Sequence, residues 1–381
     1  MIKIYWRPRQ VSRTALILIS LLSLGGFTAV EVFQIQSQQP FYQEKLAASR
    51  LTLAAFEALK TERTKRKHKI DLDSDPSGSG LVGELMTTVT SNTGNLPAKQ
   101  TSVNPNWAAV IVHLLKRAGA EEGDVVAVGL SGSFPALNVA TLVAMETLKL
   151  KPVVISSVAA SQWGANDPKF LWTDWEHALI EHRIISTRSV AASIGGIEDR
   201  GLGMTAEGRR IIVAAIEGAG VPLLYPRNYD ESVEQRMAIY RESAGDRPIK
   251  VYINVGGGTT SVGTKVGKHL FKPGLNLRPP SGGPMIDSVM SRFADEGVPV
   301  IHLVNVAQLA KRFGLQHQPR AIPPVGQGKV FSHAEYNLWL AGGFLLAIFA
   351  ALYAFVRSDV GFRIMQLGKR RKGGGHPEPM V

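Results

Sequence analysis

Short apolar runs and longer amphipathic stretches alternate through the middle of the chain. The runs VVAVGL and PVVISSV do not alternate internally, as is typical of strands buried on both faces of a sheet. Such runs lie at 125–130, 152–158, 184–187, 221–225, 249–255 and 298–304. Helical patterns separate or follow them at 135–149, 173–182, 205–218, 230–243, 283–296 and 306–313. This order predicts an α/β domain with a mainly parallel, doubly wound sheet of about six strands and helices on both faces.

Two longer apolar segments flank the alternating region, at residues 14–35 and 336–356. The second contains no charged residue, and the first contains none until Glu31. A membrane-spanning helix needs about 20 apolar residues, so we predict a transmembrane helix in each segment. For the first segment, a secretory signal peptide is the alternative. We favour an uncleaved anchor, since no small-x-small cleavage site followed by a polar start stands near residues 28–34.

The formal net charge of +12 lies mainly outside the predicted α/β region. Residues 81–356 hold 25 basic and 22 acidic side chains, so most of the excess belongs to the two ends and to the basic run at 60–69. We therefore expect no nucleic-acid partner. We expect the basic run to be a solvated face, and contact with a polyanion is the alternative.

The basic ends also predict the membrane topology. Because cytoplasmic segments carry an excess of Lys and Arg, both termini are expected in the cytoplasm and the central region outside the plasma membrane. The predicted organisation is a cytoplasmic basic tail (1–13), a transmembrane helix (14–35), a juxtamembrane helix and linker (36–80), an extracytoplasmic α/β domain (81–330), a second transmembrane helix (336–356) and a second basic tail (357–381). The chain has no cysteine, which excludes disulfides, thiolate metal sites and a cysteine nucleophile.

Small and polar residues gather where several predicted strands end. GLSGS follows the first strand, SSVAASQWGANDP the second, SVAASIGGIEDRGLGM the third and NVGGGTTSVGTKVG the fifth. Ligands of open parallel sheets bind at the carboxyl ends of the strands, and glycines let backbone N–H groups approach an anion closely. We therefore predict an anion pocket lined by Gly129, Ser131, Gly132, Ser133, Gly195, Gly196, Asp199, Arg200, Gly256, Gly257, Gly258, Thr259, Thr260, Arg278, Ser281 and Gly282.

The GLSGS segment has three interpretations. It matches the nucleophile elbow G-x-S-x-G except at its last position, which would make Ser131 a catalytic nucleophile. The base would then come from the histidines, of which the candidates are His113, His177, His182, His269 and His302. Alternatively, Ser131, Gly132 and Ser133 hold an anion, which we favour. The third interpretation is a tight turn in which Ser133 caps the helix that contains Pro135.

Other candidate sites have weaker support. VYINVGGGTTSVG resembles the second phosphate loop of the actin-like ATPases, but Asn254 stands where that family has a metal-positioning Asp. Asp174, His177 and Glu181 share one face of a predicted helix and suit a metal or a proton relay. We favour the alternative, in which Asp174 and Glu176 belong to the helix's first turn while Trp172 and Trp175 pack on the sheet. Neither a metal nor a cofactor is expected.

Arginines are also expected near the pocket edge. Asp199 and Arg200 either hold each other or face the pocket. Arg200, Arg227 and Arg278 each follow a predicted strand, where a guanidinium suits bidentate recognition of a carboxylate.

Five segments together resemble a known family. They are VGLSGSFPALN, SVAASQWGANDP, SIGGIEDRGLG, INVGGGTTSVG and GLNLRPPSGGP, and they lie between the two apolar segments. The chain resembles the poly-gamma-glutamate system protein family over about residues 100–330, with both anchors similar in kind. The resemblance implies a bacterial envelope protein that works beside an ATP-dependent amide ligase and other membrane proteins of poly-gamma-glutamate synthesis and export. It implies no residue roles.

These observations lead to one expected function and two alternatives. We expect an accessory membrane component of capsule-polymer synthesis whose outer domain binds or guides the polyanion. The first alternative is an extracytoplasmic hydrolase or transpeptidase-like enzyme that acts on γ-glutamyl bonds through Ser131. The second is a structural scaffold for the ligase.

Overall fold

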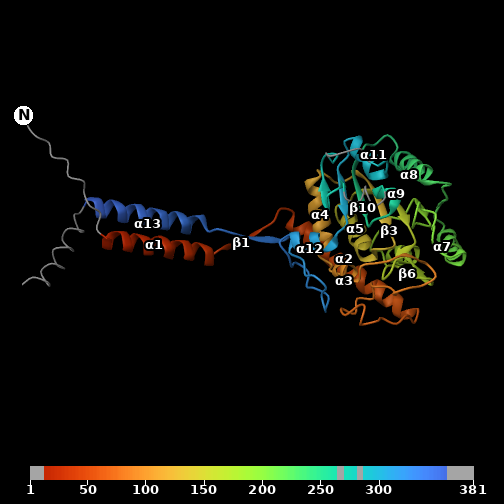
Figure 1. The fold of residues 1–381 in the computed structure, drawn as a ribbon, viewed down its shortest axis with the longest axis horizontal. Helices are drawn as coiled ribbons and strands as arrows, with labels where there is room; N and C mark the ends of the chain where they lie inside the picture. The colour runs from red at the N-terminus through yellow and green to blue at the C-terminus, as the bar shows by residue number, and fades with distance from the viewer. Residues whose placement is uncertain (1–12, 264–269, 281–285, 358–381) are drawn as a thin grey trace, which may run out of the picture. The chain divides into compact units, whose positions relative to one another are not determined.

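The computed structural model describes residues 13–263, 270–280 and 286–357. The chain divides into two compact units. One unit is Gln38–Phe331, and the other combines Met1–Ser37 with Ser332–Val381. The larger unit is an α/β domain, and the smaller contains the two terminal helices (Figure 1).

A seven-stranded sheet forms the centre of the α/β unit. Its strand order is β11-β12-β10-β3-β4-β8-β9. All neighbours are parallel except β11, which pairs antiparallel with β12 at one edge. The strands are β3 (Val125–Ser131), β4 (Lys151–Ser157), β8 (Ala191–Ser193), β9 (Leu223–Leu224), β10 (Ile249–Val255), β11 (Gly274–Asn276) and β12 (Val300–Leu303). The mainly parallel sheet is confirmed, with one more strand than expected.

The third strand lies further along the chain than the apolar run predicted. Residues 184–187 form no strand; β8 occupies 191–193 instead. Ile184 and Ile185 are buried in the core beside α6 (Trp172–Glu181), just after that helix ends. Their apolar character therefore reflects helix-to-sheet packing, which a short run cannot distinguish from a strand.

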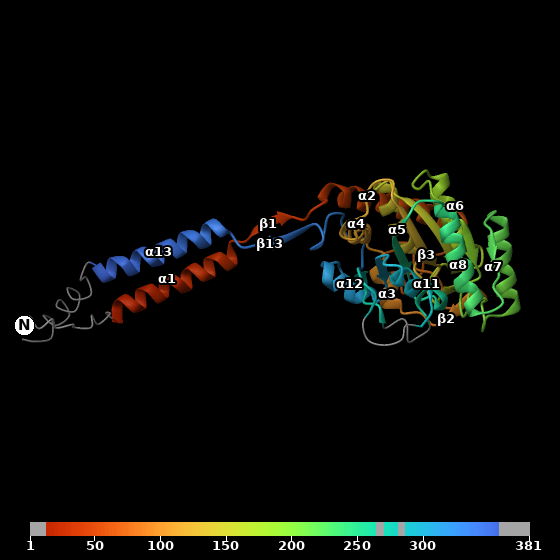
Figure 2. The same cartoon turned by 90° about the horizontal axis from the view of Figure 1, so that it is seen from above.

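Helices cover both faces of the sheet (Figures 1 and 2). Alternate residues of β3 belong to different cores: Val126 and Val128 pack into one, Val125 and Ala127 into the other. The first core includes α2 (Tyr42–Lys65), α4 (Trp107–Arg117), α5 (Pro135–Thr147), α6 and α12 (Val306–Phe313). The second includes α8 (Tyr229–Ala244), α9 (Thr259–Val262) and α11 (Val289–Asp295). A third cluster joins α7 (Ala206–Gly218) to β8.

The strand order reverses between β3 and β10. From β3 the chain adds β4, β8 and β9 in one direction, then returns to place β10 and β12 on the opposite side of β3. The helix after β3, α5, packs into the first core, whereas α9, after β10, packs into the second. The two strands therefore end where their connections diverge, which is the position at which open α/β sheets bind ligands.

The α/β unit begins earlier than the predicted boundary at residue 81. Helix α2 buries Ala48, Phe56 and Leu59 and contacts α4, α5 and α6. Its apolar face therefore completes one side of the central core, and the unit starts at Gln38.

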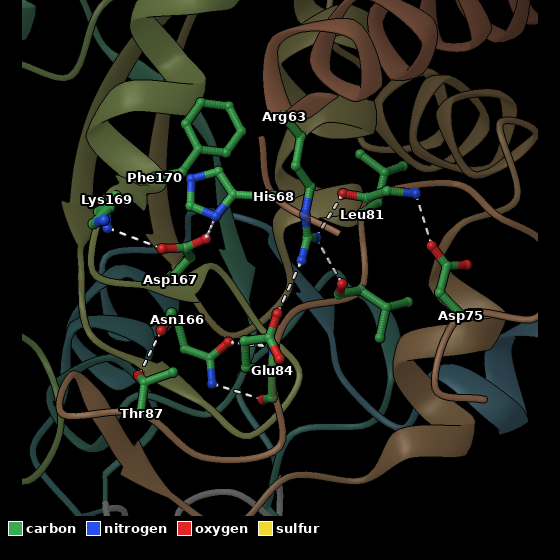
Figure 3. A network of polar contacts seen from close by, with 12 residues as sticks. Arg63, His68, Asp75, Leu81, Glu84, Thr87, Asn166, Asp167, Lys169 and Phe170 are labelled. Carbon is green, nitrogen blue, oxygen red and sulfur yellow. Dashed lines mark hydrogen bonds and ion pairs between the residues drawn. The ribbon is translucent and has the colours of Figure 1, made fainter. Parts of the chain in front are cut away.

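The basic run and the segment after it fold onto the α/β unit (Figure 3). The guanidinium of Arg63 is buried and donates to the backbone carbonyls of Gly80 and Val82, at 2.9 and 2.8 Å. His68 contacts Asp167 at 2.5 Å, and Arg66 lies 4.8 Å from the ring centroid of Phe170. The expected linker is thus an ordered part of the domain, and several cations of the run have intramolecular partners.

Smaller elements complete the α/β unit. Strand β2 (Thr90–Asn92) pairs in parallel with β5 (Ala160–Ser161), and β6 (Asn166–Asp167) pairs antiparallel with β7 (Phe170–Leu171). Helix α3 (Leu96–Ser102) follows β2, and the side chain of Asn95 caps it by accepting from the N–H of Ala98 at 2.9 Å.

The smaller unit contains two helices side by side. Helix α1 (Arg13–Val32) contacts α13 (Leu338–Arg357), and Gly26 lies directly against the ring of Phe344. Strand β1 (Ile35–Gln38) pairs with β13 (Ser332–Glu335). Among the described helices, α13 is long and apolar enough to cross a membrane, whereas the apolar part of α1, Leu16–Val32, is shorter.

Replacing Arg63 tests whether the run at 60–69 is structural. Arg63→Ala removes the donor of two buried carbonyls, so we expect a loss of about 2–4 kcal/mol in the free energy of unfolding of the α/β unit. Urea denaturation of the full chain in detergent measures it. The control is Lys65→Ala, which removes an exposed ion pair with Glu62 and should cost less than about 0.5 kcal/mol. Equal effects of the two variants would contradict a structural role for Arg63.

Candidate ligand-binding site at the sheet edge

A pocket of about 740 Å³ opens at the carboxyl ends of the central strands. Ser131 ends β3 and Ser157 ends β4, and both line it. The loop after β10 supplies Gly257, Gly258 and Thr259. Further walls come from residues 91–95, α3, the loop after β8, residues 271–273 and the start of α12.

The close approach of β3 and β10 explains one of the glycines. Gly256 has a φ of +91°, and a Cβ built on it would lie 3.2 Å from the Cβ of Ser131. Its N–H donates to the carbonyl of Leu303 in β12, at 3.1 Å. Gly256 therefore lets the chain turn beside Ser131 without forming part of the pocket wall.

The GLSGS turn uses its polar groups internally. The N–H of Gly132 donates to the carbonyl of Ser157 at 2.8 Å, and a Cβ on Gly132 would lie 2.4 Å from the carbonyl oxygen of Val158. The hydroxyl of Ser131 accepts from the N–H of Ser133 at 3.2 Å, and that of Ser133 from the N–H of Ser161 at 3.0 Å. The Gly132 N–H is therefore not free to bind the predicted anion, because it extends the hydrogen bonding between β3 and β4.

The alternative of a simple capped turn also differs from the structure. Pro135 begins α5, as expected, but the N-cap position belongs to Phe134, with no side-chain cap. Ser133 instead ties the turn to β5 through its hydroxyl.

Lys99, on α3, is a buried lysine in the pocket wall. Its ammonium donates to the hydroxyl of Ser161 at 2.9 Å and to the carbonyl of Ser133, and it lies 4.0 Å from the ring centroid of Phe134. The residue is only 2% exposed, and this burial lowers the pKa of Lys99 to about 7. No sequence pattern singles out Lys99, because its approach depends on how the short helix α3 packs.

A buried ion pair lies under the loop after β8. Arg236, from α8, donates through Nε to Asp199 at 2.6 Å, and both side chains are nearly inaccessible. Three serine hydroxyls complete the cluster around this pair; they belong to Ser157, Ser193 and Ser232. Burial alone would raise the pKa of Asp199, but the charge of Arg236 and these hydrogen bonds hold it below its usual range.

The backbone at Asp199 is unusual as well. Glu198 and Asp199 have φ values of +56° and +58°, in the left-handed region that non-glycine residues seldom adopt. The N–H of Glu198 donates to the hydroxyl of Thr259 at 3.1 Å. The ion pair and this hydrogen bond offset the free-energy cost of the left-handed backbone, and they hold the loop at the pocket.

The predicted site residues divide into three groups. Ser131, Ser133, Gly196, Asp199, Gly257, Gly258 and Thr259 line the pocket. Those that do not line it are Gly129, Gly132, Gly195, Arg200, Gly256, Thr260 and Arg278. Ser281 and Gly282 fall outside the described residues.

Three of the residues outside the lining have other contacts. Gly129 lies inside the sheet, where a Cβ would be 2.6 Å from the hydroxyl of Tyr252. Arg200 pairs with Glu198 at 3.4 Å, not with Asp199, and Thr260 contacts the hydroxyl of Ser232 at 3.2 Å. Arg227, likewise, pairs with Glu231 at 2.9 Å and is exposed.

No described histidine lines the pocket. His302 lies buried in β12 with its Nδ1 3.0 Å from the side-chain nitrogen of Asn254. His113 packs edge-on against Phe313, and His177 forms an exposed pair with Glu181. His182 contacts Glu62 at 3.3 Å, and His269 falls outside the described residues. A Ser131–histidine pair is therefore absent from the part of the chain that the structure describes.

The other candidate sites have structural roles. Asp174 accepts from the N–H of Leu171 at 2.8 Å at the start of α6, and Trp172 and Trp175 are buried. Within the described residues, no group of three or more potential metal ligands occurs. Asn254 donates to the carbonyl of Gly256 at 2.7 Å, inside the sheet.

Comparison with known proteins returns no relatives. No family model matches the chain, and neither a curated protein nor a solved structure matches it.

Breaking the Asp199–Arg236 pair tests its stabilising role. Arg236→Met leaves a buried carboxylate without its cation, so we expect a loss of about 3–5 kcal/mol in the free energy of unfolding at pH 7. Because the pKa of Asp199 is lowered in the folded protein, the pair's contribution is complete above the carboxyl's unfolded pKa and is lost as pH falls through the folded value. In the variant, burial without the cation raises the pKa of Asp199 instead. The unpaired carboxyl therefore takes up a proton as pH falls from 7, and the destabilisation should shrink towards pH 4.

A control comes from the same helix. Arg241 is exposed and pairs with Glu296, so Arg241→Met should change the stability by less than about 0.5 kcal/mol. A loss for Arg236→Met that stays constant between pH 7 and pH 4 would contradict the electrostatic explanation. Denaturant unfolding at each pH provides the measurement.

Proposed function

We propose that this protein is a membrane-tethered accessory component of poly-gamma-glutamate synthesis or export, and that its pocket binds the carboxylates of the polymer. The observation that carries the proposal is the uncompensated positive charge in the pocket wall. The carboxylate of Asp199 is neutralised by Arg236, which leaves Lys99 and Lys272 as the charged side chains in the lining without a described acidic partner. A polyanion is the ligand class that such a wall favours.

The composition of the wall supports a carboxylate ligand. Besides Lys99, the hydroxyl-bearing residues Ser131, Ser157, Ser161 and Thr259 line the same space. Hydroxyl and ammonium donors suit carboxylate oxygens. A volume near 740 Å³ lies within the range of about 300–1,000 Å³ that small-molecule sites occupy, so a short stretch of polymer fits.

The membrane setting supports the cellular role. Helix α13 is apolar enough to span a bilayer, and we propose α1 as the second span. Basic residues flank both apolar segments on their outer ends, which favours two cytoplasmic termini and an extracytoplasmic α/β unit. A polymer-binding domain outside the membrane would lie on the side where an exported capsule polymer emerges.

Binding of the polymer depends on the charge of Lys99. We expect full-length protein in detergent to bind short γ-linked glutamate oligomers, and Lys99→Met to weaken this binding about tenfold or more, as expected for loss of a buried charged donor. Because a bound carboxylate favours the ammonium form, affinity should fall as pH rises through about 7. Titration calorimetry at several pH values and salt concentrations measures both effects.

Two controls accompany this experiment. Lys151→Met removes an exposed lysine at the opposite end of β4 from Ser157, so it should leave the affinity unchanged. Oligomers of γ-linked isoglutamine, in which the α-carboxylate is replaced by an amide, keep the backbone but lack the charge, and should bind weakly. Equal affinity for the charged and neutral oligomers would overturn the proposal.

The two-pass topology is testable because the chain has no cysteine of its own. A single cysteine at Lys149, in the α/β unit, should react with a membrane-impermeant maleimide added to intact spheroplasts. One at Arg9 should react only after the membrane is permeabilised. Labelling of Arg9→Cys in intact cells would contradict a cytoplasmic N-terminus.

A further inference from the structure

Ser161 occupies a defined position in the pocket wall. It lies on β5, where it pairs with Asn92 of β2, and its N–H donates to the hydroxyl of Ser133. Its side chain lines the pocket and is 7% exposed. Backbone contacts on both sides therefore hold the Ser161 hydroxyl against the cavity.

The amine of Lys99 lies 2.9 Å from that hydroxyl. The carbonyl of Ser133 and the ring of Phe134 fix the amine from other directions. A nucleophile within hydrogen-bond reach of a base, with a third group orienting the base, is the arrangement of activated serines. In its neutral form the amine accepts the hydroxyl proton, and burial makes that form accessible near neutral pH.

We propose that Ser161 and Lys99 form a nucleophile–base pair that cleaves or transfers acyl groups at amide or ester carbonyls bound in the pocket. The Ser161 oxygen attacks the carbonyl carbon while its proton moves to the Lys99 nitrogen. The carbon–nitrogen or carbon–oxygen bond of the substrate then breaks, and the leaving group takes the proton from Lys99. Water, or an acceptor amine, gives its proton to Lys99 as it attacks the acyl-serine, releasing Ser161 with its proton restored.

Ser161 is a better nucleophile candidate than Ser131. The hydroxyl of Ser131 accepts the N–H of Ser133, and the lysine contact belongs to Ser161. The other charged side chains in the lining are Asp199, which is held by Arg236, and Lys272. The identity of the substrate, a γ-glutamyl amide beside a carboxylate, rests on the proposed function, whereas the reactivity of the pair does not.

A fluorophosphonate probe tests the pair on the full-length protein in detergent. We expect covalent labelling, mapped to Ser161 by mass spectrometry and abolished in Ser161→Ala. Lys99→Met should slow the reaction by about 100-fold or more, the usual contribution of a general base. The rate for the unmodified chain should rise with pH through about 7, since the neutral amine is the reactive form. Ser186→Ala removes an exposed serine outside the pocket; it is the matched control and should label normally.

Two variants separate this inference from the proposed function. Ser161→Ala removes one hydroxyl of the wall but keeps the Lys99 ammonium, so it should lose labelling completely while it weakens binding of γ-linked glutamate oligomers less than Lys99→Met does. Lys99→Arg keeps a positive charge but no accessible base, so it should bind and not label. Melting temperatures of each variant confirm folding, and Ser161→Ala decides the question alone if Lys99→Arg is unstable. No labelling of the folded chain, labelling at Ser131, or a rate unaffected by Lys99→Met would overturn the pair.

Discussion

The packing of β10 against β3 is the constraint on which the pocket depends. The register that places Asn254 beside Gly129 brings the ends of both strands together, and Gly256 must turn within van der Waals distance of Ser131. The connections after these strands run to opposite faces, and the pocket lies at the strand ends where they diverge. The other walls of the pocket, including α3 and the loop after β8, surround the ends of these two strands.

The charged groups at the pocket are of two kinds: an ion pair whose charges cancel, and a lysine whose charge does not. Asp199 and Arg236 neutralise each other and are surrounded by hydroxyls, so they contribute rigidity without net charge. Among the described residues, the hydrogen-bond partners of Lys99 are uncharged, and burial brings its two protonation states close in free energy near pH 7. The charged state favours anion binding and the neutral state favours proton abstraction, so the proposed roles have opposite dependence on pH.

Much of the fold was predictable because its signals are local. The runs of β3, β4 and β10 and the helices α5, α7 and α12 follow the hydrophobic pattern closely. The run at 184–187 was misassigned because apolar character reports burial and not the kind of element. The role of α2 was missed because its buried face includes polar residues such as Lys45, Ser49 and Thr52, and the pattern gives no sign of what it packs against.

The site was only partly predictable, for a different physical reason. Ser131, Asp199 and the loop after β10 lie at strand ends, which the topology rule brings to one edge. Lys99 and Arg236 lie on helices far away in sequence, and only tertiary packing carries them to that edge. The glycine-rich pattern also suggested free N–H donors, whereas the Gly132 donor is used to extend the sheet.

The strand order also has a consequence for the order of synthesis. Strands β4, β8 and β9 all leave the ribosome before β10, which begins at Ile249, more than a hundred residues after β3 ends. Until β10 is made, the nascent sheet ends at β3, whose N–H and C=O groups on that edge have no strand to pair with. Unpaired edges of this kind template aggregation. The segment that later completes the pocket is therefore also the one whose late synthesis leaves the partly formed sheet open to misassembly.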